Sequence, residues 1–269
     1  MNQKKRRPRQ GGARLGQHFL TGTWAAKKLV EAAGIGAEDL VLEIGPGKGA
    51  LTDELLKTGA RVVAIEKDVD LVAQLRGGSR RDRLVVINAD VRDIDPRALG
   101  LRAGRYILAA NIPYYITGEI LRTFLSAEEQ PTTMALLVQK EVAERVVARD
   151  GKESILSISV KAYGEPGIAA KVARGNFSPP PSVDSAILVV RHISRTFFEN
   201  IDEEFFFNVV RLGFSSKRKL LASNLAKEFG REKVGDAFGA AGLPEKARAE
   251  DVALEQWKSL AGSLFDGHT

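Results

Sequence analysis

The sequence contains no cysteine, which excludes disulfide bonds, thiolate metal ligands and a cysteine nucleophile and suits a reducing compartment. Its three histidines, at positions 18, 192 and 268, are not spaced as metal ligands, so we expect no catalytic metal. No apolar run approaches the roughly 18 residues that cross a membrane, and the N-terminus lacks the apolar core of a secretion signal. These absences predict a cytoplasmic protein without a membrane partner.

Acidic residues are missing from the first 14 positions, although the whole chain of 269 residues carries a net charge of only +6. We expect residues 1–14 to form a basic tail, whose cations include Lys4, Lys5, Arg6, Arg7 and Arg9. A second basic cluster consists of Lys217, Arg218 and Lys219. Two separate clusters favour contacts with the phosphates of a nucleic acid, although such a tail can also be a solvated arm.

Short apolar runs alternate with amphipathic stretches between residues 40 and 139. The runs predict strands at 40–44, 61–66, 83–88, 105–110 and 133–139. The stretches between them, at 49–59, 68–78 and 117–130, space their apolar residues as helices do. This alternation predicts an α/β fold with a parallel sheet and helices on both of its faces.

The rest of the chain changes character near residue 196. Before that point we predict an amphipathic helix at 139–150 and strands at 167–174 and 185–193, while 154–163 fits either a strand or a helix. After it come four helical patterns, at 203–214, 217–230, 231–242 and 253–265. The sequence therefore predicts a main domain over 15–195 and a small all-helical domain over 196–269.

A glycine-rich turn follows the first predicted strand in the stretch LVLEIGPGKGALT, residues 40–52. Gly45 and Gly47 allow the backbone to turn tightly and to approach a ligand closely. This pattern alone also fits a dinucleotide-binding turn, or a turn that only packs a helix on a strand.

Acidic residues lie at or near the ends of three successive predicted strands. Glu66 is placed where a carboxylate can accept hydrogen bonds from ribose hydroxyls, and Asp90 where one can receive an adenine amino group. Glu43 precedes the glycines, and a negative charge there suits the sulfonium and ammonium of S-adenosylmethionine better than a pyrophosphate. Each acid alone is often a helix N-cap, but together they predict an S-adenosylmethionine site rather than an NAD site.

The stretch NIPYYIT, residues 111–117, ends an apolar strand with an amide, a proline and two tyrosines. Proline has no N–H for a sheet ladder, and ligands bind at the carboxyl ends of strands in open α/β sheets. Asn111, Ile112, Pro113 and Tyr114 are therefore candidate catalytic residues. In the alternative interpretation the two tyrosines are a core pair, and we expect Tyr115 in particular to be structural.

These motifs resemble a known family. E-x-G-x-G-x-G, Glu66, Asp90 and NIPY, in that order, resemble class I methyltransferases that act on amino groups of nucleic-acid bases. The stretches LGQHFL (15–20), QKEVAERV (139–146) and FSPPPSVDSA (177–186) are similar to the KsgA-type small-subunit rRNA adenine N6-dimethyltransferases. The resemblance extends over residues 13–192 and implies a Rossmann-like class I methyltransferase sheet.

The resemblance also implies a reaction and a substrate. S-adenosylmethionine would be the methyl donor, and two adjacent adenines in the 3′-terminal hairpin loop of 16S rRNA would be dimethylated within an assembling small subunit. We expect the enzyme to act as a monomer. The implied residue roles are these: Gln17, His18 and Leu20 over the donor, Gly45 and Gly47 at its methionine part, Glu66 at its ribose, Asp90 at its adenine, Asn111 at donor and base, and Phe177 stacked near the target adenine.

The NIPY motif suits this chemistry because the exocyclic amine of adenine is a poor nucleophile, its lone pair being delocalised into the ring. The side-chain oxygen of Asn111 and the carbonyl of Ile112 can accept the two amine hydrogens and aim the nitrogen at the donor methyl. Pro113 fixes the chain, and Tyr114 offers a stacking face for the base. Catalysis is then mainly alignment for an in-line transfer, without a general base.

Three other functions fit parts of the pattern. An Erm-type enzyme, which methylates large-subunit rRNA and gives macrolide resistance, would share the donor site and the asparagine motif. A non-catalytic RNA-binding assembly or transcription factor would be expected to lose Gly45, Glu66, Asp90 or Asn111, all of which are present. An NAD-dependent dehydrogenase would have no use for NIPY.

Overall fold

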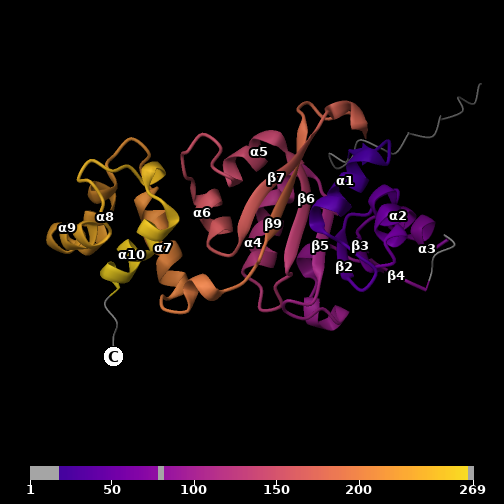
Figure 1. Cartoon of the computed structure of the whole chain (residues 1–269), viewed down its shortest axis with the longest axis horizontal. Helices are drawn as coiled ribbons and strands as arrows, with labels where there is room; N and C mark the ends of the chain where they lie inside the picture. Colours follow the sequence, from indigo (N-terminus) through magenta and orange to yellow (C-terminus); the bar gives the residue numbers. More distant parts are fainter. Residues whose placement is uncertain (1–17, 78–81, 266–269) are drawn as a thin grey trace, which may run out of the picture.

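The computed structural model describes residues 18–77 and 82–265. Its centre is a seven-stranded sheet of order β4-β3-β2-β5-β6-β9-β7 (Figure 1). The strands are β2 (Leu40–Ile44), β3 (Arg61–Glu66), β4 (Leu84–Asn88), β5 (Ile107–Asn111), β6 (Thr133–Gln139), β7 (Glu165–Val172) and β9 (Ser185–Arg191). Strands β2 to β6 pair in parallel, and β9 runs antiparallel to both β6 and β7. The five strands predicted for this parallel part are confirmed, within two residues at each end.

Helices cover both faces because the parallel strands carry apolar side chains on both faces. Along β2, Val41 belongs to one core and the next residue, Leu42, to the other. The first core is closed by α1 (Trp24–Ala33) and α2 (Ala50–Lys57), and the second by α4 (Thr117–Leu125), α5 (Lys140–Val146) and α6 (Ile155–Lys161). A further helix, α3 (Val69–Arg76), follows β3. The predicted α/β class is therefore confirmed.

The structure settles the element type of one predicted segment, α6, and shortens one predicted helix, α5. Residues 154–163, which fit either element, contain α6, and a capping box starts it: the backbone N–H of Ser157 donates to Ser154 Oγ at 3.1 Å and that of Ser154 to Ser157 Oγ at 2.7 Å. The predicted helix over 139–150 ends early, at Val146. The chain leaves the helical conformation at Ala148, which has a φ of 53°.

A short antiparallel pair lies outside the large sheet and was not predicted. β1 (Phe19–Leu20) pairs with β8 (Phe177–Ser178), which lies between the predicted strands at 167–174 and 185–193. The pair joins the LGQHFL and FSPPPSVDSA stretches, which are far apart in the sequence. It therefore brings two of the family-like motifs to the same edge of the fold.

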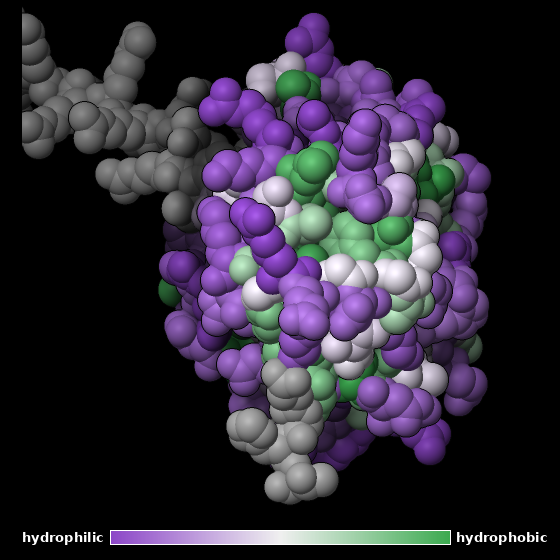
Figure 2. Space-filling view, turned by 90° about the vertical axis from the view of Figure 1, so that its left-hand side faces the viewer, coloured by the Kyte–Doolittle hydropathy of each residue, from purple (hydrophilic) through white to green (hydrophobic). Residues whose placement is uncertain are grey.

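The C-terminal segment contains the four expected helices, α7 (Glu203–Gly213), α8 (Leu221–Phe229), α9 (Arg231–Ala240) and α10 (Leu254–Leu264). They lie at one end of the long axis (Figure 1) around a core that includes the fully buried Trp257. Figure 2 shows this end of the molecule, where hydrophilic residues surround a smaller apolar area. Since Ile158 of α6 and Ala162, directly after it, belong to the same core, the domain division at residue 196 stays a prediction.

The structure offers no candidate for a membrane span: within 18–77 and 82–265 no helix has the length and apolar character to cross a bilayer. In the same ranges no cluster of His, Asp and Glu side chains has an arrangement that could hold a metal ion.

Candidate active site

A cavity opens at the carboxyl ends of β2, β3 and β5. It is lined by residues 18–20, 44–48, 50–51, 65–67, 89–92 and 111–116. Distant segments meet here; for example, the side-chain amide of Asn111 contacts the backbone of His18, 93 positions away. Most of the residues singled out in the sequence line this cavity: His18, Leu20, Gly45, Gly47, Glu66, Asp90, Asn111, Ile112, Pro113 and Tyr114. Gln17 lies outside the described residues.

The glycine turn between β2 and α2 forms one wall of the cavity. Gly45 and Gly47 have φ angles of 67° and 57°, in the left-handed region that favours glycine. A Cβ added to Gly47 would lie 3.0 Å from two ring carbons of Phe19, and one added to Gly45 would lie 3.7 Å from the carbonyl oxygen of Asn111. Lys48 Nζ lies 4.9 Å from the centroid of the same Phe19 ring. The turn is thus packed closely against β1 and faces the end of β5.

Glu66 ties the glycine turn to the start of α3. Its Oε2 accepts a hydrogen bond from the backbone N–H of Gly47 at 3.1 Å, and its Oε1 accepts one from Asp68 N–H at 3.0 Å. The residue is only 5% exposed. A carboxylate has about four acceptor positions, so Glu66 retains acceptor capacity for hydroxyl groups of a ligand.

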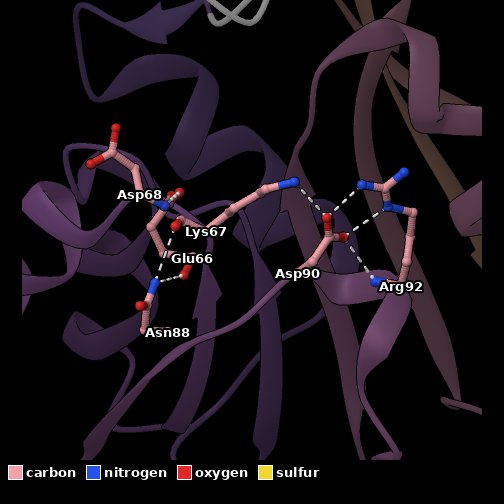
Figure 3. A network of polar contacts seen from close by, with 6 residues as sticks. All are labelled: Glu66, Lys67, Asp68, Asn88, Asp90 and Arg92. Carbon is pink, nitrogen blue, oxygen red and sulfur yellow. Dashed lines mark hydrogen bonds and ion pairs between the residues drawn. The ribbon is translucent and has the colours of Figure 1, made fainter.

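Asp90 is held by two cations, which the sequence analysis did not identify (Figure 3). Lys67 Nζ lies 2.8 Å from its Oδ2, and Arg92 donates from Nε to Oδ1 at 2.9 Å and from Nη2 to Oδ2 at 2.5 Å. The bonds from Arg92, followed by that from Lys67, hold the pKa of Asp90 well below its usual range. Asp90 is therefore an ionised carboxylate, and Lys67 and Arg92 line the same cavity. The signal in the sequence was their position: Lys67 directly follows Glu66, and Arg92 lies two residues after Asp90.

The side-chain amide of Asn111 has a fixed orientation. Its Nδ2 donates to the carbonyl oxygen of His18 at 3.2 Å, and the His18 ring is itself held by a 2.8 Å hydrogen bond from Nδ1 to the carbonyl of Pro179. This arrangement uses the amide as a donor on one side and leaves Oδ1 as an acceptor on the other. The end of β5 is therefore equipped to bind a hydrogen-bond donor such as an amine.

Tyr114 is anchored on two sides. A 2.7 Å hydrogen bond joins its hydroxyl to Ser185 Oγ, and its ring stacks on the His18 ring with a centroid distance of 5.8 Å. Burial raises the pKa of the Tyr114 hydroxyl, so the group stays protonated at neutral pH. Ser185, at the start of β9, was missed in the sequence because a serine in a strand gives no signal of such a contact.

Glu43 differs from the expectation that it offers a negative charge to the donor. It is buried, and it does not line the cavity. Burial raises its pKa to about 8, an effect that the nearby Thr52 only partly opposes, and neither carboxyl oxygen makes a well-formed hydrogen bond with a described residue. Glu43 is thus mostly neutral at pH 7 in this structure, because its desolvation outweighs the groups that would stabilise the charge.

Two aromatic residues also differ from their expected places. Phe177 is 3% exposed and packs in the core with α1, so the structure does not place it in the cavity. Its backbone pairs with Leu20, and its side chain belongs to the apolar core that α1 and α2 cover. Tyr115, expected to be a structural residue, is 71% exposed and lines the cavity.

Comparison with known proteins shows which family the chain belongs to. The profile of the family described as ribosomal RNA adenine dimethylase matches residues 9–265. The chain belongs to this family. The predicted family is thereby confirmed, and with it the predicted enzyme class, a methyltransferase that acts on adenines of ribosomal RNA.

Individual relatives of this adenine dimethylase are similar over nearly the whole chain. Ribosomal RNA small subunit methyltransferase A of Dehalococcoides mccartyi (strain CBDB1) is 40% identical over 251 residues, which are 91% of this chain and 86% of that protein. The crystal structure of the 23S rRNA methyltransferase ErmE superposes with a TM-score of 0.76 at 30% identity, covering 91% of this chain and 99% of that one. A dimethyladenosine transferase from Plasmodium falciparum gives 0.74 at 25% identity, covering 90% and 96%. Both superpositions confirm the predicted methyltransferase fold.

Proposed function

We propose that this adenine dimethylase uses S-adenosylmethionine to dimethylate N6 of two adjacent adenines in the 3′-terminal hairpin loop of small-subunit rRNA. It would act as a monomer on an assembling subunit in the cytoplasm. The observation that carries the proposal is the fixed amide of Asn111, whose Oδ1 remains an acceptor beside the glycine turn. The small subunit is favoured over the large one by the name of the relatives that are up to 40% identical.

The cavity suits S-adenosylmethionine. Gly45 and Gly47 line the cavity with backbone alone, which suits a close approach of the methionine part. Glu66 keeps acceptor capacity for ribose hydroxyls. Lys67 and Arg92 already donate four hydrogen bonds to Asp90, so the ionised carboxylate would accept from the adenine amino group in place of the exposed Lys67. His18 and Leu20 line the cavity; the role expected of Gln17 stays a prediction, because that residue lies outside the described ranges. When bound, S-adenosylmethionine supplies an electrophilic methyl group on its sulfonium.

The chain's own residues then orient the adenine amine. Asn111 Oδ1 and the carbonyl of Ile112 accept its two hydrogens, which directs the nitrogen lone pair away from the ring and toward the donor. Pro113, with φ of −56°, fixes the carbonyl that precedes it. Tyr114 supports the base, and its raised pKa keeps the hydroxyl protonated, so it does not serve as a base. The methylated amine is acidic enough to release its proton to water.

Replacing Asp90 by asparagine should weaken S-adenosylmethionine binding by about tenfold, because a charged hydrogen bond to the adenine amine is replaced by a neutral one. Isothermal titration calorimetry measures this directly. Asp95→Asn is the matched control, because the Asp95 carboxylate caps η2 (Pro96–Leu99) as Asp90 caps η1 (Val91–Asp93) but does not line the cavity. Equal donor affinities of the two variants would show that Asp90 does not contact the donor.

A second cavity suits the RNA. This cleft, of about 1370 Å³, lies between α4, α5 and α6 on one side and α7 with the following turn on the other. Five basic residues that line it form no ion pair with a described residue: Arg122, Arg211, Lys217, Lys219 and Arg248. Lys217, Arg218 and Lys219 are exposed in the turn before α8, not in a helix as predicted. The turn is held by Asn224, whose Nδ2 donates to the carbonyls of Gly213 and Ser216 at 2.7 and 3.1 Å.

Replacing Lys217, Arg218 and Lys219 by alanine should weaken RNA binding and reduce the slope of log K against log salt by about 2, since each phosphate contact contributes roughly 0.7–0.9. Fluorescence titrations of small-subunit rRNA at several salt concentrations measure the slope. Arg97→Ala serves as control, because Arg97 is paired with Glu128 and Glu129.

Removing residues 1–13 tests the basic tail, which lies outside the described residues. In this variant or in the triple alanine variant, a slope that stays the same would mean that the cations removed do not contact phosphates.

An Erm-type activity on the large subunit is the second candidate, favoured by the TM-score of 0.76 with ErmE. Small-subunit and large-subunit methylation are distinguished by offering the enzyme labelled S-adenosylmethionine with an equal mixture of unmodified small and large subunits. We expect label in the small-subunit rRNA alone. Label in the large-subunit rRNA would replace the proposed function by the Erm-type one.

A further inference from the structure

Tyr115 is the most exposed large apolar side chain in the described part of the chain, at 71%. Its ring stacks on no other described ring, in contrast to that of Tyr114. Single exposed apolar residues are common on protein surfaces, so exposure alone does not indicate a function for Tyr115, and its position has to be considered. It directly follows the four residues that orient the target base, and it lines the same cavity.

The turn that places Tyr114 also fixes Tyr115. Both belong to η3 (Tyr114–Ile116), closed by a 3.2 Å hydrogen bond from Ile116 N–H to the carbonyl of Pro113, and α4 follows at the buried Thr117. Tyr114 is turned toward Ser185 and His18, while Tyr115 faces solvent. The same turn therefore directs the Tyr114 ring toward the protein and the Tyr115 ring toward solvent.

Tyr115 lines the donor cavity and lies three positions before Gly118, the first residue of this segment that lines the cleft. Residues 111–116 line the donor cavity, and Gly118 and Arg122 line the cleft with the unpaired basic residues. A Cβ added to Gly118 would meet no atom within 4 Å, so open space borders the turn. A strand that lies in the cleft and inserts one base into the donor cavity would pass the Tyr115 ring.

We infer that Tyr115 stacks on the base next to the adenine being methylated, and that it thereby favours substrates in which a purine flanks the target. The inference rests on the proposed function, because two adjacent adenines always place one adenine beside the other. Tyr115 is in this account a positioning residue: it holds the flanking base, and Asn111 holds the amine. The ring face matters and the hydroxyl does not.

The test compares Tyr115→Ala with Tyr115→Phe on small subunits reconstituted from RNA transcripts, in which the flanking base is either adenine or uracil. With adenine, Tyr115→Ala should lower kcat/KM about 5- to 150-fold, the equivalent of the roughly 1–3 kcal/mol that base–aromatic stacking is worth. Tyr115→Phe should stay within about twofold of the wild type. With uracil, a weaker stacking base, the difference between wild type and Tyr115→Ala should shrink to a few-fold. Trp24→Ala, another exposed aromatic outside the cavity, is the control.

Two results would overturn the inference: Tyr115→Ala as active as wild type on the adenine substrate, or an equal loss on both substrates. Calorimetry should show that S-adenosylmethionine affinity falls much less than kcat/KM in Tyr115→Ala, which separates stacking from a disturbed donor cavity. No transfer by the wild type would instead contradict the proposed function. Stacking can also be measured without methyl transfer, from the fluorescence of 2-aminopurine placed at the flanking position of the RNA. This fluorescence should be quenched when the RNA binds wild type or Tyr115→Phe, and it should stay unquenched with Tyr115→Ala. Equal quenching by all three would refute the stacking.

Discussion

Replacing Asn111 by alanine is expected to reduce methyl transfer by about 10²–10³-fold at saturating RNA and donor. The side chain is fixed by its 3.2 Å hydrogen bond to the His18 carbonyl, so its Oδ1 is a preorganised acceptor for the adenine amine. Alanine removes this acceptor and leaves the His18 carbonyl without its donor. Because the reaction depends mainly on alignment, loss of one orienting group affects the rate more than it affects binding.

The loss should therefore appear in single-turnover rates, while RNA and S-adenosylmethionine affinities change by less than about tenfold. Asn176→Ala is the matched control, since among the described residues the Asn176 side chain bonds only to the carbonyl of Ala173, outside the cavity. The proposed alignment is wrong if Asn111→Ala keeps the wild-type single-turnover rate.

Replacing Glu43 by glutamine is expected to change how stability depends on pH. The pKa of Glu43 is about 8 in the folded chain and 4.5 in its ordinary environment. Between these values the folded state binds a proton that the unfolded state releases, so the free energy of unfolding decreases as pH rises. The contribution of Glu43 is fully present below pH 4.5 and is lost as pH rises through 8. Glutamine keeps the shape and cannot ionise, so this decrease should disappear.

Urea unfolding at pH 5, 7 and 9 measures the effect. At pH 5 wild type and Glu43→Gln should differ little, whereas at pH 9 the variant should be more stable by a few kcal/mol. Glu38→Gln, on the exposed loop before β2, should follow the wild-type profile. Parallel pH profiles of wild type and Glu43→Gln would mean that burial does not hold Glu43 in its neutral form.

Much of this site could be predicted because parallel strands end at one edge of a sheet. The apolar runs place β2, β3 and β5 correctly, and the residues at or directly after their carboxyl ends, Gly45, Glu66 and Asn111, then have to converge. Periodicity is a local property of the sequence, and it was sufficient for these elements. The four C-terminal helices were found for the same reason.

What the sequence did not reveal depends on contacts between distant segments or on burial. The β1–β8 pair and the Tyr114–Ser185 bond join residues separated by 157 and 71 positions, with no periodic signal. The ion pair between Lys67 and Asp90 joins residues 23 positions apart, which only the fold brings together. Glu43 has the residue type that the donor motif leads one to expect, and only its burial shows that it is neutral at pH 7. Tyr115 is an aromatic residue whose exposure follows from the direction of a turn.

The most direct test of the proposed function is nucleoside analysis of small-subunit rRNA after reaction with S-adenosylmethionine. The substrate should be small subunits that lack the adenine modification, with wild type and Asn111→Ala compared in parallel. We expect the wild type to produce N6,N6-dimethyladenosine at two adjacent adenines of the 3′-terminal hairpin loop, and Asn111→Ala to produce almost none in the same time. Dimethyladenosine only at another site, or its absence while the RNA still binds, would contradict the proposed function.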